Sequence, residues 1–449
     1  MASDTSDRNG DGSQESAMTR LWTILAAPIG IVVVVVPASA QVDGDLIVQP
    51  AIPQDFNRDR NVSVTERPQP DYSPLGVPLG GFKLYPRIET GAGGTSNTYY
   101  TLQDKIASPF LYVQGSARLA SSWSRHLLRI TATATQRDYI GESRRNENQW
   151  SLDAFGRLDV YHSLTIEADA KASRQTENLF SGAVTSTVAA LSHYRRNFAS
   201  LKTTYTQGRL RTFALLDYTN LSYSNAPLLT GDIFDASSRN RHVVRLTGQL
   251  EYARSPSVSL FAQLGGARTV YDHDPLSGLP RTNSKEARLL VGTNVDIAGR
   301  VRGTIGLGYS IRDYDASVYR PVRGLSVEAQ LEAFPTDRLT IGLSSERTIE
   351  DSTVGSRAPY WNSEFGLRVD YELLRNCIIT ATGEYSRQSY LDSSRKNNIY
   401  RMGTAARYSV SRRMSLRGAI SYSQRSSSNN ADLGSANEAR IEAGIAYQL

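Results

Sequence analysis

Hydrophobic and polar residues alternate with a period of two along most of the chain. One face of a representative segment consists of Trp150, Leu152, Ala154, Gly156, Leu158 and Val160, and the residues between them are mostly polar. The same alternation recurs in 287–297, 325–333 and 400–410. This period indicates β-strands with one apolar and one polar face. The segments run to roughly 10–14 residues, which is long for a soluble sheet but suits a tilted membrane strand.

The connections between these segments are alternately short and long. Short turns are predicted near Ser121, Tyr161, Gln207, Arg254, Ala298, Pro335, Leu374 and Ser411. Longer polar loops are predicted at 177–190, 224–238, 271–284 and 426–436. Counting from Phe82 gives about 18 strands, with 16 as the alternative. We therefore expect an all-β, transmembrane, antiparallel up-and-down β-barrel with its short turns in the periplasm.

A β-propeller is the competing fold, because the short turns recur about every 40 residues, a spacing that propeller blades also have. A propeller blade needs four short strands, however, whereas each interval here holds two long ones. No Gly-His or Trp-Asp signature recurs either. The barrel is therefore favoured.

The C-terminus favours the barrel independently. Its last residues resemble the insertion signal read by the outer-membrane assembly machinery, with Gly444, Tyr447 and Leu449 at the key positions. This insertion signal usually ends in Phe, so Leu449 departs from it. Ile441, Ala443 and Ile445 share a face with Tyr447 and Leu449. An amphipathic last strand meets the need of a barrel to close without a free edge in lipid.

The N-terminal part predicts export. Arg20 precedes an apolar run from Leu21 to Val36, and Ala38-Ser39-Ala40 is a typical cleavage site. We expect 1–40 to be a cleaved signal peptide, with Met18 as an alternative start. Residues 41–81 are Pro-rich and aperiodic, so we expect an extended segment in the periplasm or in the lumen, where it would narrow the pore. The barrel would occupy 82–449.

Composition narrows the function classes. Mean hydropathy is −0.37, which excludes a helical membrane protein. Cys377 is the only cysteine, which excludes an intrachain disulfide and a thiolate zinc cluster. Of the 50 basic residues 44 are Arg, dispersed rather than clustered. Dispersed charges suit the walls of a polar cavity better than a nucleic-acid interface. We predict no cofactor, metal or nucleic-acid partner.

Many charged residues alternate with the apolar face of their strand. They are expected on the lumenal face, because a charge in lipid costs about 2–4 kcal/mol at the bilayer midplane. Among them are Arg157, Arg302 and Arg368, which alternate with acids such as Asp153, Glu328 and Glu364. Two interpretations follow. The charges could pair across a solvated lumen, or an excess of Arg could form a constriction that selects anions.

Five tyrosines end the strands that lead into long loops: Tyr139, Tyr223, Tyr271, Tyr314 and Tyr390. Each has the parity opposite to the apolar face of its strand, so strict alternation points all five into the outer mouth. Arg137 and Arg312 lie two residues before Tyr139 and Tyr314 on the same face. Phenol rings stack on sugars and Arg pairs with carboxylates or phosphate. The alternative is an interfacial aromatic girdle, which a β-bulge would produce by shifting the parity.

Residues 60–86 carry a family resemblance. They are similar to the opening segment of the putative beta-barrel porin type 2 family of alphaproteobacterial outer membranes. The matching residues are Arg60 to Val64, Arg67, Pro68, Pro70, Tyr72, Pro74, Gly76, Gly80, Gly81, Phe82, Tyr85 and Pro86. The resemblance implies a Gram-negative outer-membrane location and, because such proteins are often associated with exopolysaccharide genes, a link to polysaccharide.

These observations favour a porin-like barrel that passes or guides polar solutes, with a link to exopolysaccharide export or saccharide passage. Its partners would be outer-membrane lipid, the assembly machinery and polysaccharide. One alternative is a structural barrel without transport. A rim-active hydrolase is less favoured, because none of the five His has a recognisable nucleophile or metal-ligand spacing. A TonB-coupled transporter would need a plug domain far longer than 41–81.

Overall fold

The computed structural model describes residues 62–177, 190, 192–228, 231–274, 278–351, 359–391, 394–428 and 435–449. The predicted signal peptide at 1–40 and the first part of the Pro-rich segment lie outside these residues. The described part contains the whole of the predicted barrel wall.

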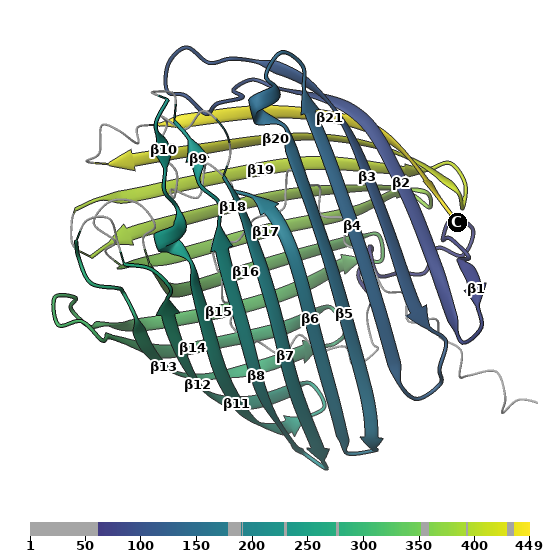
Figure 1. The fold of residues 1–449 in the computed structure, drawn as a ribbon. Helices are drawn as coiled ribbons and strands as arrows, with labels where there is room; N and C mark the ends of the chain where they lie inside the picture. The colour runs from purple at the N-terminus through teal and green to yellow at the C-terminus, as the bar shows by residue number, and fades with distance from the viewer. Residues whose placement is uncertain are drawn as a thin grey trace, which may run out of the picture.

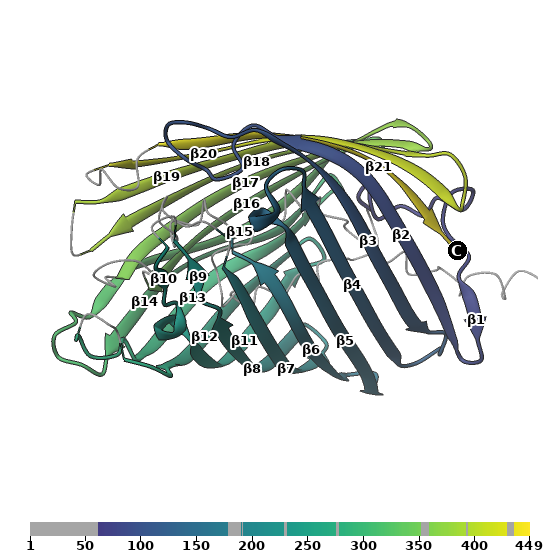
Figure 2. The ribbon, with the colours of Figure 1, turned by 45° about the horizontal axis from the view of Figure 1, so that its top comes forward.

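The wall consists of long antiparallel strands that run side by side around the molecule (Figures 1 and 2). They are β2 (Phe82–Thr95), β3 (Ser108–Ser121), β4 (Leu127–Tyr139), β5 (Glu147–Tyr161), β6 (Leu164–Thr176), β7 (His193–Gln207), β8 (Leu210–Tyr223), β11 (Arg241–Ser255), β12 (Val258–Tyr271), β13 (Ser284–Ile297), β14 (Val301–Tyr314), β15 (Val322–Thr336), β16 (Leu339–Asp351), β17 (Pro359–Leu374), β18 (Cys377–Tyr390), β19 (Lys396–Ser409), β20 (Met414–Ser428) and β21 (Ala436–Gln448). Each pairs with its neighbours in sequence, and β21 pairs with β2. The predicted barrel of 18 strands is confirmed, and the alternatives of 16 strands and of a propeller are wrong.

The connections follow the predicted alternation. The short turns join β3 to β4, β5 to β6, β7 to β8 and so on, at each of the positions that the sequence indicated. The other end of the barrel carries the longer loops. These contain the short strands β9 (Ala226–Pro227) and β10 (Ile233–Phe234) and the 3-10 helices Ser143–Arg145 and Ser237–Arg239. Short turns at one end and long loops at the other fix the orientation, with the short turns in the periplasm.

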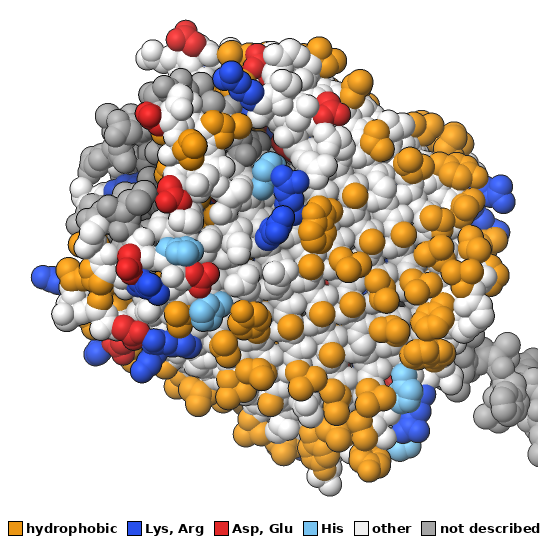
Figure 3. All heavy atoms as spheres, viewed as in Figure 1, with side chains coloured by type: hydrophobic (Ala, Val, Ile, Leu, Met, Phe, Trp, Pro, Cys, Tyr) orange, Lys and Arg blue, Asp and Glu red, His pale blue; other side chains and the backbone are white. Residues whose placement is uncertain are grey.

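The outer surface of the wall is apolar. Large hydrophobic side chains point away from the barrel, and some are more than half exposed, such as Leu264 at 63% and Ile420 at 61%. Figure 3 shows them as a broad hydrophobic band between the two ends. Because a contiguous apolar surface of this extent is unfavourable in water, the band is the lipid-facing part of the wall.

Two segments, β1 (Val77–Leu79) and β21, together cover the edge of β2 at which the barrel closes. β1 pairs with the first residues of β2, and β21 pairs with the rest, from Arg87 opposite Gln448 to Thr95 opposite Arg440. The Leu449 N–H donates to the Pro86 carbonyl oxygen (3.2 Å) where the two segments meet. In Figure 1 the C-terminus accordingly lies beside β1. Since unpaired backbone groups are costly in lipid, this sharing leaves β2 without a free edge.

The residues of the insertion motif divide between the two faces of β21. Tyr447 and Leu449 point outward with Ile441 and Ile445, as the alternation predicted. Gly444 faces the lumen, where an added Cβ would overlap the Tyr112 hydroxyl. The glycine therefore makes room for an aromatic side chain of the neighbouring wall.

Two further glycines have the same role at the seam, which is the contact between β2 and β21 where the barrel closes. A Cβ at Gly91 would lie 2.6 Å from the Tyr112 ring, and one at Gly93 would lie 2.5 Å from the Phe110 ring. Phe110 and Tyr112 are both buried against Tyr139. The rings of β3 thus lie flat over glycines of β2, which brings inner-face side chains of non-adjacent strands into reach of each other.

We predict that Gly93→Ala destabilises the barrel by about 1–3 kcal/mol, because the new methyl group forces the Phe110 ring out of place. The control is Gly418→Ala in β20, where an added Cβ has no atom within 4 Å. Urea unfolding in detergent micelles, followed by loss of the compact gel form, measures the difference. Equal stability of the two variants would contradict this packing role.

We predict that deletion of Tyr447 to Leu449 impairs insertion, because β21 then loses the end that pairs beside β1. Membrane fractionation and heat-modifiable gel mobility measure the effect. The full chain is expected in the outer-membrane fraction with its N-terminus at Gln41. Recovery of the full chain as a soluble periplasmic protein would argue against a membrane barrel.

Candidate functional site: the barrel lumen

The inner face of the wall is lined by charges that pair between neighbouring strands. Several partners lie directly opposite each other in the strand register: Arg245–Asp217 (2.8 Å), Arg302–Glu332 (2.6 Å), Arg312–Glu286 (2.6 Å) and Lys202–Glu167 (3.0 Å). Arg401–Glu384 (2.5 Å) is another such pair, and Arg288–Glu328 (2.5 Å) joins β13 to β15 across β14. The sequence left open whether lumenal charges pair or form an anion-selective constriction. Most of the predicted lumenal arginines are paired.

The predicted site arginines illustrate this. Arg302 bridges Glu332 and Glu66 (3.0 Å), and Arg312 bridges Glu286 and Asp351 (3.2 Å). Within their own strands, Arg368 pairs with Asp370 (2.7 Å) and Arg157 with Asp159 (3.4 Å). Pairs two residues apart on one strand face the same side of the sheet.

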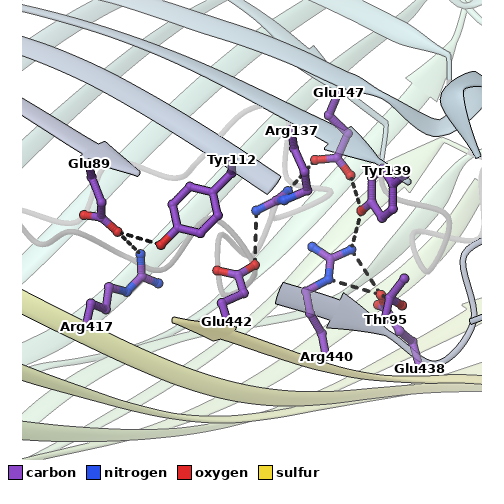
Figure 4. A network of polar contacts seen from close by, with 10 residues as sticks. All are labelled: Glu89, Thr95, Tyr112, Arg137, Tyr139, Glu147, Arg417, Glu438, Arg440 and Glu442. Atoms are coloured by element: carbon purple, nitrogen blue, oxygen red, sulfur yellow. Dashed lines mark hydrogen bonds and ion pairs between the residues drawn. The ribbon is translucent and has the colours of Figure 1, made fainter. Parts of the chain in front are cut away.

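A buried network ties the start of the barrel to its end (Figure 4). Arg137 of β4 is only 2% exposed and donates to Glu147 of β5 (2.5 Å) and to Glu442 of β21 (3.1 Å). The Tyr139 hydroxyl donates to Glu147 (3.0 Å) and accepts from Arg440 of β21 (3.1 Å). The network passes over the inner face of β2 and β3, where the glycines of the seam lie. Removing one partner would leave an unpaired buried charge, at a cost of about 3–5 kcal/mol.

The five predicted tyrosines all lie on the inner face, without a bulge that shifts their parity. Tyr139, Tyr271 and Tyr390 are buried, and the hydroxyls of Tyr271 (3.0 Å) and Tyr314 (2.9 Å) both donate to Asp351. Arginines cover three of the rings: Arg239 lies over Tyr223, Arg241 over Tyr271 and Arg395 over Tyr390. In this arrangement the rings pack and hydrogen-bond within the wall of the outer mouth.

The outer end of the β16–β17 hairpin separates from β15. Pairing between β15 and β16 stops at Val327 opposite Arg347, whereas β14 and β15 stay paired to Arg312 opposite Val322. The hairpin itself stays paired out to Asp351 opposite Pro359. β16 therefore separates from β15 at this level, whereas β17 stays paired with β18 out to Tyr360 opposite Tyr390.

The separated end folds into the lumen. Ile349 (1% exposed) and Trp361 have the parity of lipid-facing residues, yet they pack against Val322 and Tyr314 on the inner face. Asp351 accepts hydrogen bonds from Tyr271, Tyr314 and Arg312, which all point inward. Strict alternation did not predict this fold. The signal for it in the sequence is that Arg347 and Asp351 interrupt an apolar face.

The periplasmic mouth is crossed by residues of the Pro-rich segment. The Val64 N–H donates to Thr340 Oγ1 (3.0 Å), and Arg67 pairs with Glu372 (2.9 Å). Further along, Arg412 donates to the Pro70 carbonyl oxygen (3.0 Å). Burial opposes ionisation of Glu66, but its ion pair with Arg302 lowers the pKa of the carboxyl below its usual range. The segment thus narrows the lumen at its short-turn end.

A cavity of about 440 Å³ remains between this segment and the wall. Hydroxyl and amide side chains of β3, β4 and β5 line it, namely Gln114, Ser116, Thr131, Thr133, Thr135, Gln149 and Ser151. Within the described part of the chain, no hydrogen bond engages the side chains of Thr131, Thr133, Thr135 or Gln149. Arg407 also lines the cavity, and among the described residues it has no ion-pair partner. This lining can bind a polar solute without breaking an internal contact.

Catalytic and metal chemistry have little support in the described residues. No group of three or more His, Cys, Asp or Glu in that part of the chain is arranged to hold a metal ion. His242 pairs with Asp272 at the rim (3.3 Å), but in the described structure no serine hydroxyl donates to its ring. The described ranges also contain no helix that is long and apolar enough to cross a membrane.

An apolar outer face, a closed ladder of long strands and a charged lumen together define an outer-membrane β-barrel of the porin-like class. The chain belongs to the family described as Putative beta-barrel porin 2, whose sequence model matches residues 69–449. This agrees with the resemblance of residues 60–86. No curated protein matches the sequence.

Solved structures with a similar course include several outer-membrane receptors. A ferric enterobactin receptor (PfeA) mutant from Pseudomonas aeruginosa aligns with a TM-score of 0.43 at 9% identity, over 82% of this chain and 80% of that chain. The copper transporter OprC aligns with a TM-score of 0.44 at 12% identity, over 83% and 81%. The alcaligin receptor FauA from Bordetella pertussis aligns with a TM-score of 0.41 at 10% identity, over 81% and 76%. The family assignment rests on the sequence match alone.

We predict that Asp351→Asn raises the single-channel conductance, because the hairpin end loses its ion pair with Arg312 and can leave the lumen. Loss of this buried charge pairing weakens docking of the hairpin by about 3–5 kcal/mol. The control is Asp315→Asn, which breaks the exposed Arg268–Asp315 pair outside the lumen. Planar-bilayer recordings measure both variants. Equal conductance of Asp351→Asn and wild type would show that the hairpin does not limit the current.

Proposed function

We propose that this barrel passes polar, saccharide-like solutes across the outer membrane, with a preference for acidic saccharides such as those of exported polysaccharide. The observation that carries the proposal is the lumenal cavity lined by free hydroxyl and amide groups. Elsewhere in the described lumen most charged side chains are occupied by partners on the protein. The cavity is therefore where a solute gains hydrogen bonds at the lowest cost.

The geometry of the lining suits a sugar chain. Thr131, Thr133 and Thr135 follow one another on the inner face of β4, so their hydroxyls recur at about every second residue, roughly 7 Å apart. Gln114 and Gln149 flank them on β3 and β5. A row of this kind offers successive hydrogen bonds to a solute that moves along the strand.

Positive charge at the periplasmic end supports the preference for acidic sugars. Arg87, Arg118 and Arg407 line the cavity there, and Glu66, the only acid among the described residues of its lining, is paired with Arg302. Arg407 can pair with a uronate carboxylate or a phosphate. This chemistry and the family resemblance support the proposed link to exopolysaccharide.

We predict that uronate oligosaccharides block the current through the barrel in a planar bilayer, and that Arg407→Gln weakens this block about tenfold, as expected for one lost charge-assisted hydrogen bond in a half-buried site. Block by neutral oligosaccharides should be unchanged in Arg407→Gln and weakened in Thr133→Val. The control is Arg413→Gln, which removes an exposed charge in the β19–β20 turn.

Two outcomes would contradict the proposal. Equal block of wild type and Arg407→Gln would exclude Arg407 as a site for acidic sugars. A correctly inserted barrel that carries no current would favour the structural barrel without transport. Sugar stacking on the mouth tyrosines stays a separate prediction. If it is right, Tyr139→Ala combined with Tyr314→Ala relieves the block. The comparison counts only where heat-modifiable mobility shows that the variant is folded, because Tyr139 is buried and bonded to Glu147 and Arg440.

A further inference from the structure

A pair of arginines lies on the lipid-facing side of the wall at the level of the long loops. Arg174 of β6 is directly opposite Arg195 of β7, and Trp150 of β5 is directly opposite Arg174. The inner-face neighbour of Arg174, Ser173, is buried, so the guanidinium points outward. Figure 3 shows basic side chains and a histidine gathered above β6 and β7, at the border of the hydrophobic band.

The charges of this pair are not neutralised within the described chain. Arg174 donates to the Asn148 side chain (3.3 Å), and neither arginine pairs with a carboxylate in that part of the protein. Glu177, at the end of the same strand, is occupied by Arg239. Like charges directly opposite on neighbouring strands destabilise a sheet, so an anion between them would be stabilising.

The position of the pair identifies the source of the anion. Trp150 is 40% exposed in the same row, and tryptophan at the edge of an apolar band marks the headgroup level of a membrane. Because the long loops face the cell exterior, this is the headgroup level of the outer leaflet. Basic residues at that level bind anionic lipid headgroups.

The wall below the pair is flat enough to hold an acyl chain. Ala172 lies two residues below Arg174, and Ala154, Ala170 and Ala199 form one row across β5, β6 and β7. Small side chains in this strip let a hydrocarbon chain lie against the strands while its headgroup reaches the arginines. The strip and the pair together give one continuous surface.

We propose that Arg174 and Arg195 form a binding site for the phosphate groups of an outer-leaflet lipid, whose acyl chain lies on the alanine strip. Each guanidinium donates to phosphate oxygens in the fork geometry that suits this group. The site is independent of what passes through the lumen, because both side chains lie on the opposite face of the wall.

The test uses the full mature chain in detergent micelles, with native mass spectrometry as the readout and bis-phosphorylated lipid A as the probe. Dephosphorylated lipid A is the reference lipid. We expect Arg174→Gln with Arg195→Gln to lower the affinity for the phosphorylated probe at least tenfold, to leave that for the reference lipid unchanged, and to retain heat-modifiable mobility. Arg174→Lys with Arg195→Lys should restore only part of the affinity, because the charge is kept but the fork geometry is lost.

The matched control is Arg323→Gln with Arg387→Gln, which removes two outward, exposed arginines at the same end of β15 and β18. It should bind the probe like wild type. Unchanged binding in the Arg174→Gln and Arg195→Gln variant would overturn the proposal. An equal loss in the control variant would also overturn it, because the effect would then come from net charge rather than from this site.

Discussion

The structure depends on one constraint: in lipid, every backbone N–H and C=O of the wall must be paired within the protein. Only a closed sheet satisfies this for β-strands, and here the ladder closes where β21 meets β2. β1 then completes the lower part of β2, which β21 does not reach. Since side chains of a strand alternate between two faces, closure also decides that each second residue meets lipid and the others meet the lumen.

The lumenal charges follow from this division. A strand that is polar on one face carries Arg and Glu into a narrow space, where unpaired charges are unfavourable. Registered pairs such as Arg302–Glu332 and Arg312–Glu286 resolve this between neighbours, and the Arg137–Glu442 pair does so across the seam. Among the described residues the threonines of β4 have no hydrogen-bond partner for their hydroxyls, and this is why we propose them as the contact surface for a solute.

Much of this architecture could be predicted from the sequence, because period two, turn spacing and strand length are local properties. They gave the number of strands, the position of each short turn and the inward direction of Tyr139 and Tyr314. The inward fold of the β16–β17 end could not be predicted from alternation, since it depends on where pairing with β15 stops. The contact between Arg137 and Glu442 was equally inaccessible, because it depends on glycines that let the seam pack closely.

The most direct test of this closure is a disulfide across the seam. Ala92 of β2 and Ala443 of β21 lie directly opposite each other on the outer face, and Cys377 can be replaced by Ser. We predict that Ala92→Cys with Ala443→Cys forms an intrachain disulfide in the outer membrane, seen as a mobility shift that reductant reverses. Ala92→Cys with Ile441→Cys, two residues out of register, should not. The opposite pattern, or no disulfide in either variant of an inserted barrel, would contradict closure in this register.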